Sequence, residues 1–359
     1  MRENKMKIAL TADLHLTTSG NHPDRYHALE NILLKLIEDQ INFLIIAGDL
    51  FDSSSQNYSE FEALCKATKY KQIKFIVIPG NHDPTISNSA IVAENIHIFT
   101  EPGLVALDPE GPHFLFLPYQ AGLTMGEKID HFKGEFKPNE WILIGHGDWT
   151  KSFREVNLYE PGVYMPLTRR DIEAYSPSQV FLGHIHKPYD QGRVHYIGSP
   201  CGLDITEIGI RRFLVYDTAT GEIETKRVDT DVVYFDELLV VLPAEDERTY
   251  LEHAIKSRIE DWDIMSQDRE KVRVRVRICG YSSDRKTLLK TIKTAFQGYS
   301  FYKNEEPDIS MVSIADDPER IYIADKVRAN LEELDWPMGL DEPDKEQIIL
   351  AVLDVIYGD

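Results

Sequence analysis

The sequence predicts a layered α/β domain, followed by a small α+β unit and a helical C-terminal tail. Three observations carry this prediction: short apolar runs before residue 200, a helical pattern between the first two runs, and a change of pattern near residue 231. Strands that are buried on both faces and separated by helices are typical of layered α/β folds. The 359 residues suffice for one large domain and smaller additions.

Five runs rich in Ile, Leu, Val and Phe predict the strands of the first domain. They are residues 7–12, 43–47, 74–78, 141–144 and 179–182. Between the first two runs, apolar residues recur at helical spacing at Ala28, Leu29, Ile32, Leu33, Leu36 and Ile37. We therefore expect a helix over residues 24–38, with Asp24 as its N-cap.

After residue 231 the pattern predicts a strand at 232–242, a helix at 245–259 and a helix at 288–296. In residues 271–278, valines and an isoleucine alternate with Lys271, Arg273, Arg275 and Arg277, which predicts a half-buried strand. The tail carries two apolar stripes, Ile321, Ala324, Val327, Leu331 and Leu334, then Ile349, Val352 and Ile356. We divide the chain into residues 1–230, 231–304 and 305–359.

The formal net charge of −21 argues at face value against a polyanionic partner. Its distribution weakens that objection, because residues 305–359 hold 16 acidic and only 4 basic residues. The three cysteines are far apart, so neither disulfides nor zinc–thiolate sites are expected. Without an apolar run of roughly 18 residues or a signal-like start, we expect a cytoplasmic protein with no membrane association.

Each of the five predicted strands ends in side chains that can bind a metal. In chain order these are Asp13 and His15, then Asp49, then Asn81, His82 and Asp83, then His146, then His184 and His186. Ligands in α/β sheets bind beyond the carboxyl ends of the strands, so these groups are expected to converge. Nitrogen and oxygen ligands without thiolate suit Mn²⁺, Fe²⁺ or Zn²⁺. Two such ions roughly 3.5–4 Å apart form a clamp for displacement at phosphorus.

The ordered set D-x-H, G-D, G-N-H-D, G-H and G-H-x-H over residues 13–186 resembles the calcineurin-like metallophosphoesterase superfamily. The resemblance implies a four-layer sandwich of two β-sheets flanked by helices. It also implies one metal held by Asp13, His15, Asp49 and His186, and a second held by Asp49, Asn81, His146 and His184, with Asp49 bridging. His82 would contact the scissile phosphate and protonate the leaving oxygen. Asp83 would either orient His82 or form the turn.

Within the superfamily, the chain resembles the SbcD-type nucleases through G-D-L-F-D at 48–52, G-H-I-H at 183–186 and Y-I-G-S-P at 196–200. Ser53 and Ser54 follow Asp52, so the phosphate-gripping Arg of the phosphoprotein phosphatases is missing. Some nuclease members carry a His where this chain has Asp52, which bears on substrate handling. The resemblance implies a capping domain over 231–304. It also implies that the tail binds the coiled coil of an SMC-like P-loop ATPase of the SbcC type.

These patterns together predict a two-metal, Mn²⁺-dependent DNA nuclease acting on ends, hairpins or single strands. Expected partners are DNA and the ATPase. The sequence does not decide whether the chain also forms a homodimer. Arg169, Arg170, Lys187, Arg273, Arg275 and Arg277 are candidate DNA contacts, although the alternating strand could equally present an ordinary solvated face. The tail stripes either close the chain's own core or lie on a partner helix. The alternative functions are a small-nucleotide phosphodiesterase and a non-catalytic scaffold for the ATPase.

Overall fold

The computed structural model describes residues 6–53, 57–89, 91–150, 162–241, 247–315, 317–333 and 345–357. These residues form two compact units. The first comprises Met1–Gly202 and Arg211–Asp231, and the second comprises Leu203–Ile210 and Val232–Asp359. The short segment Leu203–Ile210 belongs to the second unit because Gly209 N donates to Tyr234 O at 2.9 Å. The helical tail lies in the second unit together with the region after residue 231.

The first unit contains two six-stranded sheets. The first sheet has the order β14-β13-β1-β2-β3-β4, formed by Ile223–Arg227, Arg212–Asp217, Lys7–Thr11, Phe43–Ala47, Lys74–Ile78 and Ile96–Ile98. The second has the order β11-β12-β10-β7-β6-β5, formed by Tyr189–Gln191, Val194–Tyr196, Gln179–Gly183, Trp141–His146, His113–Leu117 and Gly103–Ala106. All five predicted strands are present, three in the first sheet and two in the second.

The strands that precede the predicted ligands are parallel within each sheet. In the first sheet, Ala9 of β1 pairs with Leu44 of β2, which pairs with Phe75 of β3. In the second sheet, Val180 of β10 pairs with Leu143 of β7. Parallel neighbours in register end at the same edge of a sheet. The residues that follow β1, β2 and β3 therefore emerge together, and so do those that follow β7 and β10.

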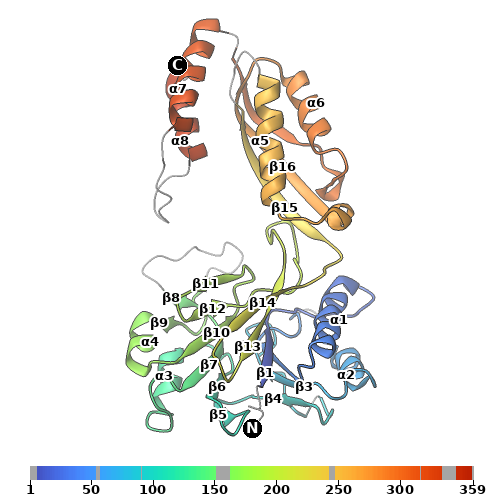
Figure 1. Ribbon diagram of the computed structural model, residues 1–359, viewed down its shortest axis with the longest axis vertical. Coiled ribbons are helices and arrows are strands. Elements are labelled where there is room, and N and C mark those ends of the chain that lie inside the picture. Colours follow the sequence, from blue (N-terminus) through green and yellow to red (C-terminus); the bar gives the residue numbers. More distant parts are fainter. Residues whose placement is uncertain are drawn as a thin grey trace. The chain divides into compact units, whose positions relative to one another are not determined.

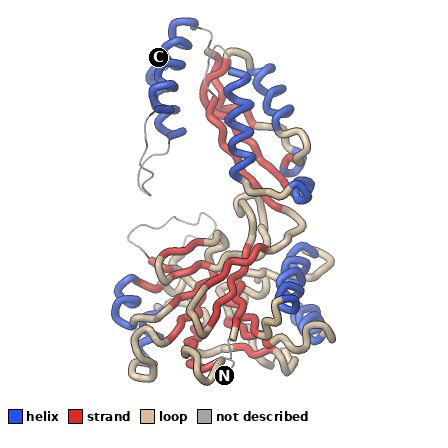
Figure 2. The backbone as a smooth tube through the Cα atoms, viewed as in Figure 1, coloured by secondary structure: helices blue, strands red, loops and turns tan. Residues whose placement is uncertain are grey.

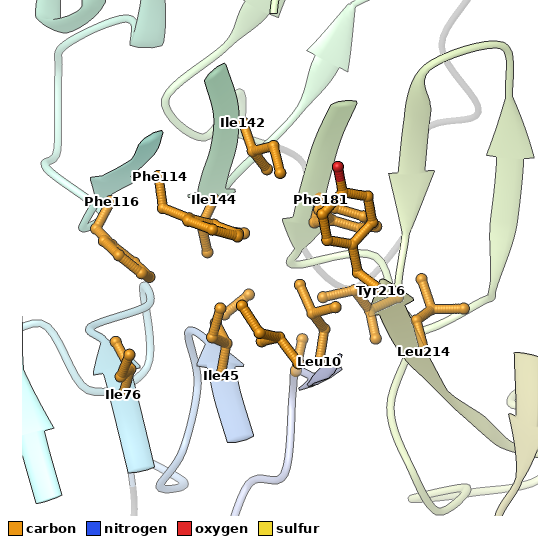
Figure 3. Packing of buried hydrophobic residues seen from close by; sticks show 14 of the residues in the cluster. Leu10, Ile45, Ile76, Phe114, Phe116, Ile142, Ile144, Phe181, Leu214 and Tyr216 are labelled. Carbon is orange, nitrogen blue, oxygen red and sulfur yellow. The ribbon is translucent and has the colours of Figure 1, made fainter. Parts of the chain in front are cut away.

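Apolar side chains from both sheets form a shared core (Figure 3). Leu10 and Ile45 of the first sheet pack in this core with Ile144 and Phe181 of the second. Helices lie on the outer faces (Figures 1 and 2), with α1 (Pro23–Glu38) and α2 (Tyr58–Lys66) beside the first sheet. Helices α3 (Met125–Asp130) and α4 (Arg169–Tyr175) pack against the second sheet, near the ribbon of β8 (Trp149–Thr150) and β9 (Leu167–Thr168). The expected sandwich of two sheets flanked by helices is confirmed.

The N-cap prediction for the first helix was wrong by two residues. Helix α1 begins at Pro23, His22 is the N-cap, and Asp24 lies inside the first turn. Proline favours the first helical position because its fixed φ suits the helix and its missing amide is not needed there. Asp24 still interacts favourably with the positive end of the helix dipole.

The second unit is built on a parallel sheet of β15 (Val233–Val241), β16 (Val272–Ser282), β17 (Ser300–Phe301) and β18 (Asp308–Ile314). Helices α5 (Glu247–Asp261) and α6 (Arg285–Ala295) connect these strands and cover one face, with a core that includes Val274, Leu251 and Ile292. Short 3₁₀ helices occupy Ser266–Lys271 and Tyr302–Asn304. The alternation seen in the sequence is confirmed, because Val272, Val274, Val276 and Ile278 are buried and the arginines between them are half-buried. Leu242 and residues 245–246 of the predicted elements lie outside the described residues.

The tail forms helices α7 (Pro318–Glu333) and α8 (Lys345–Tyr357), which pack on each other and on the second unit's sheet. Ala324 of α7 and Ile349 and Leu353 of α8 share a buried cluster with Val240 of β15 and Cys279 of β16. Part of each predicted stripe therefore closes the chain's own core, and Leu334 lies outside the described residues. None of the helices in the described part of the chain is long and apolar enough to span a membrane.

Candidate metal centre

The predicted ligands follow their strands through sharply turned backbone. Asp13, His15, Asp49 and His184 all have positive φ, at 53°, 45°, 48° and 93°. Two loops of the first sheet are tied together here, because Asp13 N donates to Gly48 O at 3.1 Å and His15 N donates to Asp49 O at 3.0 Å. Left-handed backbone is costly for residues other than glycine, and such strain collects at functional sites.

The glycines before the ligands provide space that no other residue would leave. A Cβ on Gly48 would lie 2.0 Å from His146 Nδ1, and one on Gly80 would lie 2.1 Å from Asp49 Oδ1. A Cβ on Gly183 would lie 2.0 Å from Ala47 O, where the two sheets approach each other. Gly48 and Gly80 therefore each allow a ligand from another strand to reach the centre, and Gly183 allows the two sheets to approach closely.

The first ligand set contains Asp13, His15 and His186, whose ligand atoms lie within 4.8 Å of one another. The Nε2 atoms of His15 and His186 are 3.0 Å apart. Asp13 is fully buried; its Oδ1 accepts from His184 N at 2.9 Å, and its Oδ2 has no hydrogen-bond partner among the described residues. A buried carboxylate oxygen without a hydrogen-bond partner, beside two converging imidazoles, is a suitable ligand for a divalent cation.

The second set gathers around the side-chain oxygen of Asn81. Asn81 Oδ1 lies 2.8 Å from His146 Nε2 and 3.0 Å from His184 Nδ1. His146 is fully buried, and its Nδ1 lies 2.9 Å from Ala47 O, which fixes the imidazole orientation. An amide oxygen and two imidazole nitrogens therefore converge here, as a metal site requires.

Asp49 lies between the two sets. Its Oδ2 is 3.7 Å from His15 Nε2 in the first set and 3.3 Å from His146 Nε2 in the second. The cluster of Asp13, Asp49 and His146 also has its ligand atoms within 4.8 Å of one another. One carboxylate that reaches both sets is the arrangement that a bridged pair of ions requires. The structure thus brings together all seven predicted ligands.

The charges at this site favour a cation. Burial raises the pKa of Asp13 to about 6, although His186 and His146 act against the rise. Burial also works against the charge of His146, but Asp49 and Asp13 outweigh it and raise the pKa of His146 to about 10. Burial lowers the pKa of His15 to about 3, against the attraction of Asp49. The clustered carboxylates therefore need positive charge, while His15 stays neutral and able to donate a lone pair.

His82 lies beside the first set. Its ring centroid is 4.7 Å from that of His15, with the rings nearly perpendicular, and its ligand atom lies within 4.8 Å of those of His15 and Asp49. His82 is half-buried, whereas Asp13, His15 and Asp49 are at most 2% exposed. It therefore lies where a substrate phosphate on the metal pair would be within reach.

Asp83 holds the turn that presents Asn81 and His82. Its Oδ1 accepts from Gly80 N at 2.7 Å and its Oδ2 accepts from Phe51 N at 3.0 Å. Burial raises the pKa of Asp83 to about 6, with a further contribution from Asp49 and opposition from the two backbone amides. Asp83 was expected either to orient His82 or to form the turn, and these two contacts support turn formation.

Several residues at the site were not predicted from the sequence. Asp148 Oδ1 lies 3.8 Å from His184 Nε2, and Asp148 Oδ2 accepts from Tyr164 N at 2.8 Å. The Tyr164 ring centroid is 4.7 Å from that of His184. Asp148 is two residues after His146 in the run G-H-G-D, so a carboxylate close to a ligand was the available signal. The Asp148 carboxylate therefore adds negative charge beside the far nitrogen of His184, at a distance longer than a hydrogen bond.

The candidate DNA contacts are divided between the two units. Lys187 is exposed directly after His186, and Arg169 and Arg170 are exposed on α4, where Arg169 Nε contacts Glu173 Oε1 at 2.9 Å. Arg273, Arg275 and Arg277 lie on β16 of the second unit. Arg275 and Arg277 contact Asp236 Oδ2 at 3.5 and 3.2 Å, which neutralises part of that row.

The sequence model of the calcineurin-like phosphoesterase family matches residues 6–188, just over half of the chain. The protein therefore belongs to the calcineurin-like phosphoesterases, and its activity is metal-dependent hydrolysis of phosphoesters. One solved structure aligns over its full length with 63% of this chain, at 15% sequence identity and a TM-score of 0.42.

Proposed function

We propose that this protein is a Mn²⁺-dependent DNA nuclease that hydrolyses phosphodiesters at DNA ends, hairpins or single strands. The observation that carries the proposal is the position of Asp49 Oδ2, 3.7 Å from His15 Nε2 and 3.3 Å from His146 Nε2. A bridging carboxylate between two ligand sets is suited to a pair of ions that clamp one phosphate. The set contains only nitrogen and oxygen ligands, which suit Mn²⁺ as well as Fe²⁺ or Zn²⁺.

Each residue of the centre has a distinct task in this proposal. Asp13, His15, His186 and Asp49 hold the first ion, and Asp49, Asn81, His146 and His184 hold the second. When bound, the two ions supply an activated water nucleophile and positive charge for the phosphate. His82 donates a proton to the leaving oxygen, which is a general-acid role that half-buried imidazoles perform well near neutral pH. Asp83 keeps His82 in place through the turn.

The region after the catalytic residues favours DNA over a small nucleotide as the substrate. The chain continues into a second unit with its own buried core and a row of arginines on β16. The motif resemblance to SbcD-type nucleases supports the same choice, and the missing phosphate-gripping Arg after Asp52 disfavours a monoesterase of the phosphoprotein phosphatase kind. With a net charge of −21, we expect DNA affinity to be weak and strongly salt-dependent.

An SMC-like ATPase with coiled coils is the proposed protein partner, in the cytoplasm. The tail supports this role because it exposes large apolar side chains, namely Tyr322 at 60%, Ile323 at 49% and Val355 at 83%. Exposed apolar residues on helices are typical of surfaces that bind another helix. We also propose a homodimer. The molar mass of the same preparations, measured by size-exclusion chromatography with light scattering, tests it.

The test is digestion of defined substrates by the metal-stripped full chain after Mn²⁺ is restored. Labelled linear duplex, hairpin DNA and closed single-stranded circles are compared with a cyclic nucleotide and a small aryl phosphodiester, with and without the co-expressed ATPase. Asp49→Ala serves as the inactive control and Asp39→Ala, a surface change, as the matched active control. We expect cleavage of DNA that needs Mn²⁺ and Asp49.

Two outcomes would replace the proposal. Efficient turnover of the cyclic nucleotide without DNA cleavage, even with the ATPase present, would establish the small-nucleotide phosphodiesterase. ATPase binding by a chain that holds far less than two ions per molecule would establish the scaffold. The convergence of all seven ligands speaks against the scaffold.

A further inference from the structure

Two buried arginines contact the backbone of the metal centre. Arg25, on the apolar face of α1, is 7% exposed, and its Nη1 donates to the backbone carbonyl of His15. Arg211 is 2% exposed, and its Nη1 donates to the backbone carbonyl of His186 at 2.9 Å. His15 and His186 are the two histidines whose Nε2 atoms are 3.0 Å apart in the first ligand set.

The carbonyl of His186 is enclosed by the Y-I-G-S-P motif. Ser199 N donates to His186 O at 3.1 Å, and Arg211 Nη1 lies 3.5 Å from Ser199 Oγ. Gly198 has φ +82°, and a Cβ there would lie 2.9 Å from His186 O. The motif and Arg211 therefore form one pocket for a single backbone oxygen, which gives this part of the sequence a function at the metal centre.

Fixed positive charge beside a cation site opposes metal binding, and burying a guanidinium carries a desolvation cost. We therefore expect each arginine to make a contact whose benefit to the site outweighs these two costs. His15 has left-handed backbone, with φ 45°, and a charged donor on its carbonyl fixes the peptide plane that follows. Asp52 Oδ2, 3.6 Å from Arg25 Nη1, offsets part of the charge on that side.

The second ligand set is supported differently. Ala47 O lies 2.9 Å from His146 Nδ1 and orients that ring through its own nitrogen atom, and Asp148 Oδ1 lies 3.8 Å from His184 Nε2. Neither contact involves a guanidinium. The contacts of Arg25 and Arg211 therefore affect one half of the centre.

We propose that Arg25 and Arg211 are positioning residues that hold the backbones of His15 and His186, so that the first metal binds with high affinity. The proposal rests on the dinuclear centre of the proposed function and not on DNA as the substrate. Groups that orient metal ligands typically change metal affinity about 10- to 100-fold when removed. Arg25→Met and Arg211→Met should each lower Mn²⁺ affinity at the first set by about that factor and leave the second set unchanged.

The experiment is titration of Mn²⁺ into metal-free full chain, followed by calorimetry and by electron paramagnetic resonance. Wild type should show two binding events and the signal of a spin-coupled pair. At the same Mn²⁺ concentration, each Met variant should show one isolated ion. Arg25→Lys and Arg211→Lys, which keep one charged donor, should recover part of the coupled signal. Arg193→Met removes another guanidinium of the first unit, one that contacts Asn139 Oδ1 and Pro177 O, and it should match wild type.

The possible failures are distinguishable. If wild type itself shows no coupled pair, the dinuclear centre fails and the proposed function fails with it. If wild type shows the pair and the Met variants show it at the same Mn²⁺ concentration, positioning by the arginines is refuted. If the metal-free Met variants unfold, Arg25→Gln and Arg211→Gln, which remove the charge but keep a polar side chain, decide. Gln variants that fold like wild type but bind both ions unchanged, or that lose both ions equally, would refute a role confined to the first metal.

Discussion

The backbone amide of His82 donates to Asp49 Oδ1 over 2.8 Å. This hydrogen bond links the residue proposed to act as the acid to the carboxylate proposed to bridge the two metals. It engages one oxygen of Asp49 and turns the other toward His15 and His146. Because the donor is a backbone group, every substitution of His82 except proline keeps it, and the two roles can be tested separately.

Asp49→Ala should remove both metals together. The substitution deletes the carboxylate that lies between the two ligand sets, so each set loses the oxygen that they share. Metal analysis after gel filtration should find close to two ions per chain in wild type and in Asp39→Ala, and almost none in Asp49→Ala. Retention of one ion at full occupancy would contradict bridging.

His82→Ser should keep both metals and lower turnover by about 10²- to 10⁴-fold, the usual contribution of a general acid. The amide that orients Asp49 is retained in the variant, so the metal centre should persist. Single-turnover cleavage and metal analysis on one preparation measure both effects. Because His82 also lies within ligand distance of His15 and Asp49, loss of an ion in the variant would make it a ligand and not an acid.

Metal affinity should rise with pH across the neutral range. Burial works against protonated His146, but Asp49 and Asp13 raise the pKa of His146 to about 10, so the metal-free chain holds this proton at neutral pH. A metal that binds there must displace it, and apparent affinity should rise up to about tenfold per pH unit below that pKa. Calorimetry in buffers of different ionisation enthalpy should detect the released proton. Identical heats in all buffers would argue that His146 binds metal without losing a proton.

Asp83→Ala should destabilise the first unit by about 2–5 kcal/mol, because the buried amides of Gly80 and Phe51 both lose their acceptor. Denaturant unfolding of the metal-free chain measures the change. Asp204→Ala, which removes a half-buried turn carboxylate of the second unit, is the comparison. A variant that unfolds like wild type but has lost turnover would instead favour the role of orienting His82.

The tail offers a matched pair of substitutions on α8. Leu353 is 2% exposed and packs with Val240 and Cys279, so Leu353→Ala should lower the stability of the second unit by about 2–5 kcal/mol. Val355 is 83% exposed, so Val355→Glu should leave stability nearly unchanged and weaken capture of the ATPase. Thermal unfolding and co-purification separate the two effects. Equal ATPase capture by Val355→Glu and wild type would remove this surface from the proposed interface.

The strands and the ligands could be predicted because their signals are local. An apolar run followed by Gly-Asp or Gly-His specifies both the strand and the group at its end, as at Asp49 and His146. The direction of strands in the second unit could not be predicted in this way. Alternation along residues 271–278 reports burial of one face, and burial is the same for parallel and antiparallel neighbours.

The supporting residues were harder to predict for a physical reason. Arg211 lies far from His186 in sequence, and its contact is to a backbone oxygen, which leaves no trace in residue type. Arg25 had one usable signal, because it lies four residues before Leu29 on the apolar stripe of α1, where a charged residue is out of place. The tail stripes predicted burial correctly at Ala324 and Ile349, but periodicity alone does not say which surface covers them.

Four of the seven proposed ligand positions have a backbone that glycine would adopt at no cost, whereas other residues there lose roughly 1–2 kcal/mol each. Selection for hydrolysis therefore opposes selection for folding at residues 13, 15, 49 and 184. Relatives of this chain that are no longer under selection for catalysis should acquire glycine or asparagine at these positions first, while their sheets are retained. Ligand loss with an intact sandwich would then mark relatives that have ceased to be enzymes.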